Sequence, residues 1–189
     1  MTLSFTVWGP AVGKKLAASR QGFTYLETKS RKYVAHVTAA VRAAVKDQGW
    51  TAPAPDVPVS VSAAIYVAMP ASWSKKKQAA LRAMPAVSMP DTDNVLKALY
   101  DGMMGMKVGP REHEGRVFAA DKQVAQVHAE RRWCLPEEAR VRVIVAVWSE
   151  AHIRRLFLTA DEVQAGVFRT VSAHAGKLGT QSESKAGKE

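Results

Sequence analysis

The stretch SMPDTDNVLKALYDG, residues 88–102, places two aspartates one residue apart directly before a helical pattern. One acidic residue is favoured at a helix N-terminus, because its side chain can accept a hydrogen bond from an unpaired backbone N–H group. Here Asp91 and Asp93 stand together, and Lys97 and Asp101 follow on succeeding turns. One of these residues would be enough to cap the helix, so the others indicate a functional role.

The composition of the whole chain indicates a single packed domain with a polyanionic partner. The chain has 189 residues, 47% of them hydrophobic, which is typical of a globular protein and short for two domains. Lys and Arg total 27 against 17 Asp and Glu, and this balance of +10 favours nucleic acid as a partner. A basic protein without such a partner is the alternative.

Cysteine usage and hydropathy limit the cellular setting. Cys134 is the only cysteine, so the chain can form no internal disulfide and no cysteine-based zinc site. We find no signal-peptide pattern at the N-terminus and no apolar run of the length that spans a membrane. We therefore expect a cytoplasmic protein that makes no membrane contact.

On both sides of residues 88–102, the spacing of apolar and polar residues predicts an α+β fold. Helices are expected at 28–45, 72–84 and 94–105, and strands at 3–8, 59–69, 122–133 and 139–148. In the first helix the apolar positions are Tyr33, Val34, Val37, Val41 and Ala44. Residues 11–23 are interpreted as a basic loop, and the apolar positions of 122–133 fall out of phase, which indicates a bulge. This mixed order predicts one small domain with a mixed β-sheet packed against helices.

The predicted domain ends near residue 150. Residues 1–150 carry all the predicted strands, and residues 151–173 show a helical pattern that we interpret as a C-terminal extension. Residues 174–189 are rich in small and polar side chains, so we expect a disordered tail.

The acidic residues allow two interpretations. Asp93 and Lys97 share a helix face, Asp91 lies just outside the helix, and Asp121 begins a predicted strand. If that strand starts beside the helix N-terminus, three carboxylates converge, and hard oxygen ligands of this kind suit Mg²⁺ together with a substrate phosphate. The ordinary alternative is a cap at Asp93, a surface ion pair with Lys97 and a turn acid at Asp121.

The order of these residues resembles a known family. PDTDNVLKALYDG, followed after a gap by DKQV, is similar to the RusA-like family of Holliday junction resolvases. The hallmark of that family is P-D-x-D-N-x-x-K-x-x-x-D, followed by an acid before K/A-Q-V. The segments GPAVGKKLAASRQGFTYLETKSRKY and PASWSKKKQAAL resemble its basic regions. The resemblance covers roughly residues 3–148.

The resemblance implies a small α+β domain that forms a homodimer on branched DNA. It implies a Mg²⁺-dependent endodeoxyribonuclease, with Mn²⁺ as a substitute, that resolves four-way junctions by paired nicks in recombination, repair or phage DNA processing. Asp91, Asp93 and Asp121 match the family's catalytic, metal-holding carboxylates, and Lys97 matches its active-site lysine. Ala120, where relatives often carry a second acid, and the insertion at 107–118 depart from the pattern. A non-catalytic branched-DNA binder, or a nuclease acting on flap or RNA substrates, is the alternative.

Basic residues supply the candidate DNA contacts. We expect phosphate contacts from Lys14, Lys15, Arg20, Lys75, Lys76, Lys77 and Arg131. For each of them a solvated surface charge is the alternative. Such contacts recognise the shape and charge of the nucleic acid, and they carry no direct sequence information. Trp73, next to the lysines, is a candidate for stacking on a base.

Overall fold

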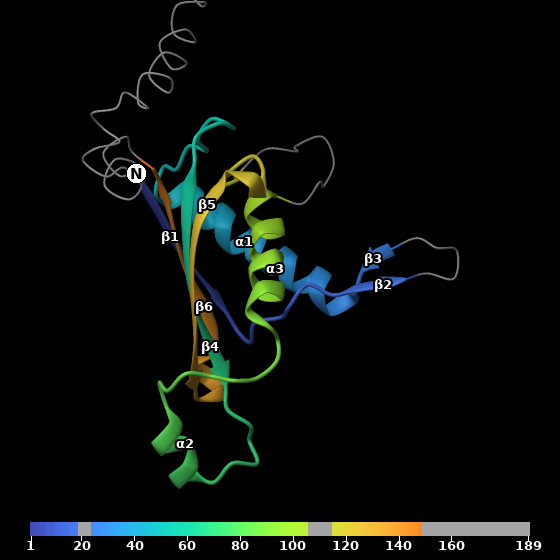
Figure 1. Ribbon diagram of the computed structural model, residues 1–189, viewed down its shortest axis with the longest axis vertical. Coiled ribbons are helices and arrows are strands. Elements are labelled where there is room, and N and C mark those ends of the chain that lie inside the picture. The colour runs from blue at the N-terminus through green and yellow to red at the C-terminus, as the bar shows by residue number, and fades with distance from the viewer. Residues whose placement is uncertain (19–23, 106–114, 149–189) are drawn as a thin grey trace, which may run out of the picture. The chain divides into compact units, whose positions relative to one another are not determined.

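The computed structural model describes residues 1–18, 24–105 and 115–148 (Figure 1). Residues Met1–Val147 form one compact unit. The second unit, Trp148–Glu189, lies outside the described residues except for Trp148. The helical extension predicted at 151–173 and the tail predicted at 174–189 therefore lie outside the described residues, and so does Arg20. In the described ranges, no helix is long and apolar enough to cross a membrane.

A four-stranded mixed sheet forms the centre of the first unit, in the order β1-β6-β4-β5. Its strands are β1 (Thr2–Trp8), β4 (Val59–Ala68), β5 (Val124–Cys134) and β6 (Arg140–Val147). β6 pairs antiparallel with both β1 and β4, while β5 runs parallel to β4 at one edge. The predicted α+β class with a mixed sheet is confirmed.

The bulge expected in the 122–133 segment is present at the start of β5. Val59 pairs with Val124, but Ser60 pairs with Gln126, so Ala125 has no partner on β4. The extra residue shifts the alternation of side chains along the strand, which explains the phase break in the sequence. The short 3₁₀ turns η1 (Asp121–Gln123) and η2 (Pro136–Glu138) come just before β5 and β6.

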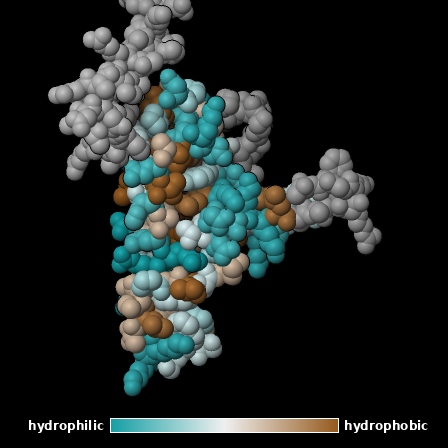
Figure 2. Space-filling model, viewed as in Figure 1, coloured by the Kyte–Doolittle hydropathy of each residue, from teal (hydrophilic) through white to brown (hydrophobic). Residues whose placement is uncertain are grey.

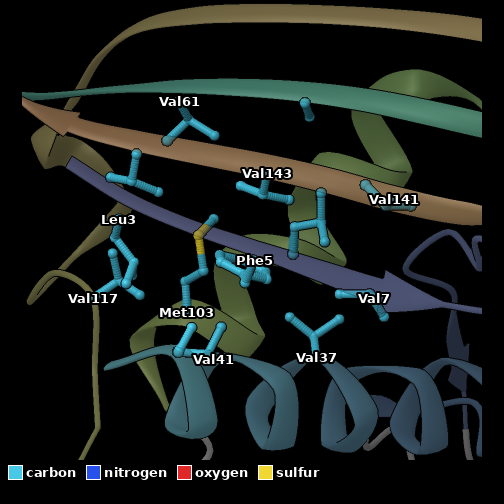
Figure 3. Packing of buried hydrophobic residues seen from close by; sticks show 14 of the residues in the cluster. Leu3, Phe5, Val7, Val37, Val41, Val61, Met103, Val117, Val141 and Val143 are labelled. Carbon is cyan, nitrogen blue, oxygen red and sulfur yellow. The ribbon is translucent and has the colours of Figure 1, made fainter. Parts of the chain in front are cut away.

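Two helices cover one face of the sheet, α1 (Thr28–Asp47) and α3 (Thr92–Met104). Alternate residues of the strands point toward them, among them Leu3, Phe5 and Val7 of β1 (Figure 3). The buried positions of α1 include all five predicted ones, Tyr33, Val34, Val37, Val41 and Ala44. Each fully buried aliphatic side chain of this layer contributes about 1.5–3 kcal/mol relative to exposure.

Close packing of α1 against α3 depends on Gly102. A Cβ atom at this position would overlap the side chain of Val37, so any larger residue would push the two helices apart. The hydroxyl of Thr38 donates to the Gly102 carbonyl oxygen at 3.4 Å, across the same contact. Gly102 therefore fixes how near α3, and the acidic residues it carries, lies to α1.

Two local predictions need correction. Residues 11–23 are not all loop, because β2 (Leu16–Ala18) pairs with β3 (Thr24–Leu26) as a separate two-stranded sheet. Neither strand has a strong alternating pattern; the pairing is extended by a backbone bond from Glu27 N to Lys15 O, 2.9 Å, at the base of α1. The helix predicted at 72–84 is shorter, α2 (Lys75–Leu81), with Ser74 as its N-cap.

Candidate active site

The N-terminus of α3 presents Asp91 without using it as a cap. Asp91 occupies the N-cap position, but its side chain makes no capping hydrogen bond, and it is exposed. The chain before it is held from the side by Arg131 of β5, whose guanidinium donates to the carbonyl oxygens of Ser88 at 2.5 Å and Pro90 at 3.1 Å. The Asp91 carboxylate is thus positioned by its backbone and remains available to a ligand.

Asp93 lies in the first turn of α3 and is paired with Lys97 one turn later. The Lys97 Nζ atom lies 3.1 Å from Oδ2 of Asp93, and both side chains are largely exposed. The hydrogen bond from Lys97 is the main reason that the pKa of Asp93 falls below its ordinary value. Asp93 therefore stays ionised to a lower pH than an unpaired aspartate would.

The basic loop that follows β1 packs against the same end of α3. Lys14 N donates to the Asn94 carbonyl oxygen at 2.8 Å, and a Cβ on Gly13 would come within 3.0 Å of Asn94 and Pro90. Buried Ser30 of α1 ties the loop down, accepting from Lys15 N at 3.0 Å and donating to Gly13 O at 2.9 Å. Tertiary contacts thus bring the predicted basic loop to the predicted acidic motif.

Asp101 forms an ion pair with Lys14 of the basic loop. From its place in the sequence, it could have faced solvent or paired with Lys97. Its Oδ2 atom lies 2.8 Å from Nζ of Lys14, with both side chains about a quarter to a third exposed. Because the ion pair joins the loop to α3, Asp101 acts as a support for the site. Lys14, a predicted phosphate contact, is the other half of this pair.

Asp121 is placed by a buried glutamine. The side-chain oxygen of Gln123 accepts from Ala119 N at 2.7 Å and Ala120 N at 3.3 Å. Its amide nitrogen donates to the carbonyl oxygens of Ala54 and Val57, at 2.8 and 3.1 Å. Since Gln123 is almost fully buried, these bonds fix the turn that carries Asp121 at its exposed start.

The charge of Asp121 reaches the side chain of Tyr100 on α3. Burial raises the pKa of Tyr100, and the charge of Asp121 raises that pKa further. Within the described residues, the buried Tyr100 hydroxyl has no hydrogen-bond partner. Lys97 is four residues after Asp93 and Tyr100 three after Lys97, so all three lie on one helix face, and the charge of Asp121 acts at the later end of that face.

The expected convergence of the Asp91, Asp93 and Asp121 carboxylates is not found. β5 ends, rather than begins, beside the N-terminus of α3, as the contact of Arg131 with Pro90 shows. Asp121 instead lies near the later part of α3, where Phe118 packs edge-on against Tyr100 and Val117 N bonds to Met103 O at 2.8 Å. Across residues 1–18, 24–105 and 115–148, no three Asp, Glu, His or Cys side chains form a group that could hold a metal ion.

The residues present still suit Mg²⁺ chemically. Mg²⁺ keeps several waters and binds through one or two carboxylates plus substrate phosphate, so it does not need a complete protein cage. Asp91 and Asp93 supply two exposed carboxylates at one helix end, and the Tyr100 hydroxyl beside Asp121 is a buried polar group without a partner. The two carboxylates at the helix end are what an ion with its waters and a phosphate would complete, while the Tyr100 hydroxyl lies further along α3.

The predicted DNA contacts differ in how available they are. Lys15 is about three-quarters exposed, with Glu27 at 3.9 Å, and Lys75 and Lys76 of α2 are exposed. Lys77 lies over the Trp73 ring, 4.0 Å from its centroid, so one face of this candidate base-stacking ring is covered. Arg131 is engaged in holding the chain before α3. Arg20 lies outside the described residues.

Three residues of the site were given no role by sequence reasoning. Gln123 stands inside the D-K-Q-V element that carries the family resemblance, and that position was its only signal. Gly13 sits in a loop where only its close approach to α3 reveals the need for glycine. Tyr100 has the i, i+3 spacing from Lys97 that places it on the acidic face, and this spacing could have identified it.

The fold and the acidic face define a basic α+β protein with exposed carboxylates and a lysine gathered on one helix. A family model, endodeoxyribonuclease RusA, matches residues 9–146. The chain therefore belongs to the RusA endodeoxyribonuclease family, whose members act on branched DNA junctions. A search of curated proteins found no match to the chain. Family membership makes the protein a nuclease by class and confirms the resemblance read from the acidic motif.

Proposed function

We propose that the protein is a Mg²⁺-dependent, structure-selective endodeoxyribonuclease that resolves four-way DNA junctions by paired nicks, in recombination, repair or phage DNA processing. The observation that carries the proposal is the end of α3, where uncapped Asp91 and the Asp93–Lys97 pair adjoin a docked basic loop. Membership of the RusA family supports the same substrate class.

Asp91 and Asp93 are the acids that would hold the ion, with Mn²⁺ able to replace Mg²⁺. Asp121 would join them only if its turn moves toward the start of α3 when DNA binds. When bound, such an ion polarises a phosphate oxygen and lowers the pKa of a coordinated water. Lys97 places positive charge where negative charge develops on the phosphate during the reaction. Lys14 holds the loop and α3 together, while exposed Lys15 attracts the DNA backbone.

Two sites are required for paired nicks on opposing strands. A homodimer with a two-fold axis supplies them with the symmetry of the junction. We include the homodimer in the proposed function, and its test is the molecular mass of the protein in solution, alone and with a junction.

A test of this function compares cleavage of a labelled four-way junction with a short mobile core by wild type and by Asp93→Asn. Wild type is expected to nick the junction in Mg²⁺ and to leave a linear duplex of the same sequence intact. Asp93→Asn is expected to lose about 100-fold or more in rate, because the charge that holds the ion is removed. Asp47→Asn, at the exposed last residue of α1, is the matched control and should cleave like wild type.

A second candidate is a branched-DNA-binding protein that does not cleave. Ala120 in place of an acid, and the lack of a three-acid group in the described residues, favour it. Wild-type protein that binds the junction in EDTA, but leaves it intact in both Mg²⁺ and Mn²⁺, would establish this alternative and remove the nuclease proposal. Cleavage that favours flap or RNA substrates would redirect the proposal to those substrates.

A further inference from the structure

The segment between β4 and α3 combines positive charge with exposed hydrophobic side chains. Residues 70–90, PASWSKKKQAALRAMPAVSMP, hold four basic residues and no Asp or Glu. Met84, Val87 and Met89 are 52%, 87% and 73% exposed. In Figure 2, hydrophobic residues reach the surface among hydrophilic ones in the lower part of the view, where α2 lies in Figure 1. We call Met84, Val87 and Met89 the apolar ridge.

The apolar ridge is mounted on a firm support. Ala83 N donates to Trp133 O at 2.9 Å, Trp133 N donates to Met84 O at 2.9 Å, and both bonds join the segment to β5. A third backbone bond, Ala86 N to Arg131 O at 3.0 Å, continues the contact, and the Ala86 side chain is buried. The segment is therefore attached to the edge of the sheet while its larger apolar side chains face solvent.

Single exposed hydrophobic residues are normal on protein surfaces, but an exposed group of them marks an interaction site. The apolar ridge places three within six residues, on backbone that is hydrogen-bonded to β5. Arg131 donates to the carbonyl oxygens of Ser88 and Pro90, on either side of Met89, so it holds the end of the ridge that directly precedes Asp91. Whatever covers the ridge must therefore lie next to the acidic face.

The surrounding charges indicate what that partner is. Lys75 and Lys76 are exposed on α2, and residues 70–90 contain no Asp or Glu, although Arg82 is ion-paired with Glu138 of η2. Met89 precedes Asp91 by two residues, so their Cα atoms lie within about 7 Å of each other. A partner that is anionic outside and apolar within, close to a phosphate-cleaving site, is DNA whose bases are accessible.

We propose that the apolar ridge contacts unstacked bases at the branch point of the DNA. Proteins that deform DNA insert Met, Leu, Ile or Pro side chains between base steps, beside Lys and Arg contacts to phosphate. Opening a step costs least where bases are already poorly stacked or unpaired. The ridge thus favours branched DNA over a continuous duplex, and it places the branch beside Asp91. This inference rests on the proposed function, because it assumes that branched DNA is the substrate.

The test uses binding without cleavage, with Ca²⁺ in place of Mg²⁺. The DNA is a four-way junction with 2-aminopurine at the branch, whose fluorescence rises when the base loses its stacking partners. The double variant Val87→Ser with Met89→Gln is compared with wild type. The matched control, Val127→Ser with Ile144→Gln, removes two exposed apolar side chains from β5 and β6.

The ridge variant is expected to bind the junction about tenfold more weakly and to lose the fluorescence rise. Its affinity for a linear duplex should change by less than about twofold, because its phosphate contacts remain. The control variant should match wild type on both DNAs. Unaltered junction affinity and fluorescence in the ridge variant would overturn the inference, as would an equal loss on both DNAs or a wild type that produces no fluorescence rise.

Failure of the proposed function has a different signature. If wild type prefers the junction and raises the fluorescence but never nicks DNA in Mg²⁺ or Mn²⁺, then the nuclease proposal falls and the ridge inference stands. If wild type nicks junctions and the ridge variant keeps full selectivity, then only the ridge inference falls.

Discussion

Helices α2 and α3 are consecutive in the chain, and both carry lysines, but they are held in different ways. α3 buries Val95, Ala98, Leu99, Gly102 and Met103, whereas α2 buries no residue. A group that acts on one phosphate must hold one position, and α3 supplies that by anchoring its opposite face in the core. Charges that attract any phosphate along a backbone do not need such precision. Under the proposed function, the two helices therefore suit different tasks: α3 would position the catalytic residues, and α2 would attract phosphate.

The largest difference between the helices should appear in stability. Leu99→Ala on α3 removes a side chain with no exposed surface, so the free energy of unfolding should fall by about 2–5 kcal/mol. Leu81→Ala on α2 removes a half-buried side chain, so its loss should be about 1 kcal/mol or less. Denaturant unfolding of both variants measures the difference. Equal losses would show that α2 is anchored as firmly as α3.

The next largest effect should appear in the cleavage rate when one lysine on each helix is replaced. Lys97→Met should lower the rate at saturating junction by about 100-fold or more, because the positive charge beside Asp93 is lost. Lys76→Met should weaken binding and leave the saturated rate unchanged, since Lys76 is only a candidate phosphate contact. Single-turnover cleavage in Mg²⁺ separates the two quantities. A lowered saturated rate in Lys76→Met would move that residue into the active site.

A smaller effect is expected in the salt dependence of binding. Each lysine that neutralises a phosphate contributes about 0.9 to the slope of log affinity against log salt, so Lys75→Ala with Lys76→Ala should lower the slope by up to about 1.8. The reduction should be similar for junction and duplex. Lys77 is left intact, so its contact with Trp73 is preserved. An unchanged slope would indicate that α2 does not touch phosphate.

The smallest effect concerns the ionisation of Asp93. Its pKa lies below the ordinary value of 3.8, mainly because of the hydrogen bond from Lys97, so it should rise in Lys97→Met. The folded carboxyl is the stronger acid, so the pair's stabilisation is present above the unfolded pKa. It is lost as pH falls through the lowered folded pKa. Carboxyl NMR titration measures both values; an unshifted pKa in the variant would mean that the ion pair does not form in solution.

Much of the fold could be predicted, because it depends on local patterns. The predicted positions of α1 are buried as expected, since residues three and four apart share a helix face. The bulge in β5 was predicted from a break in the alternation of apolar and polar residues in the sequence. The pairing of β2 with β3 was missed, because neither strand has the β-branched alternation that identifies a strand. The two strands, β2 and β3, are brought together by the tertiary contacts of the segments that flank them.

The residues of the candidate site stay a prediction, and the structure shows how their arrangement differs from the one expected from the sequence. The spacing of Asp93 and Lys97 sufficed for their ion pair, which forms within one helix. The partner of Asp101 is Lys14, from a loop 87 positions earlier in the chain, and no local pattern indicates such a contact. Asp121 was expected beside the helix N-terminus, but the direction of β5 relative to α3 places it near Tyr100.

By itself, the amino-acid sequence determined most of the helices and strands, the family and the chemical character of the acidic motif, because these depend on residue types at short spacings. Tertiary structure alone decided three other features. The basic loop packs on α3 through Gly13 and Lys14. The direction of β5 places Asp121 nearer to Tyr100 than to Asp91, and the apolar ridge is exposed. Each of these depends on contacts between distant segments, whose order and direction follow from how the sheet and helices pack.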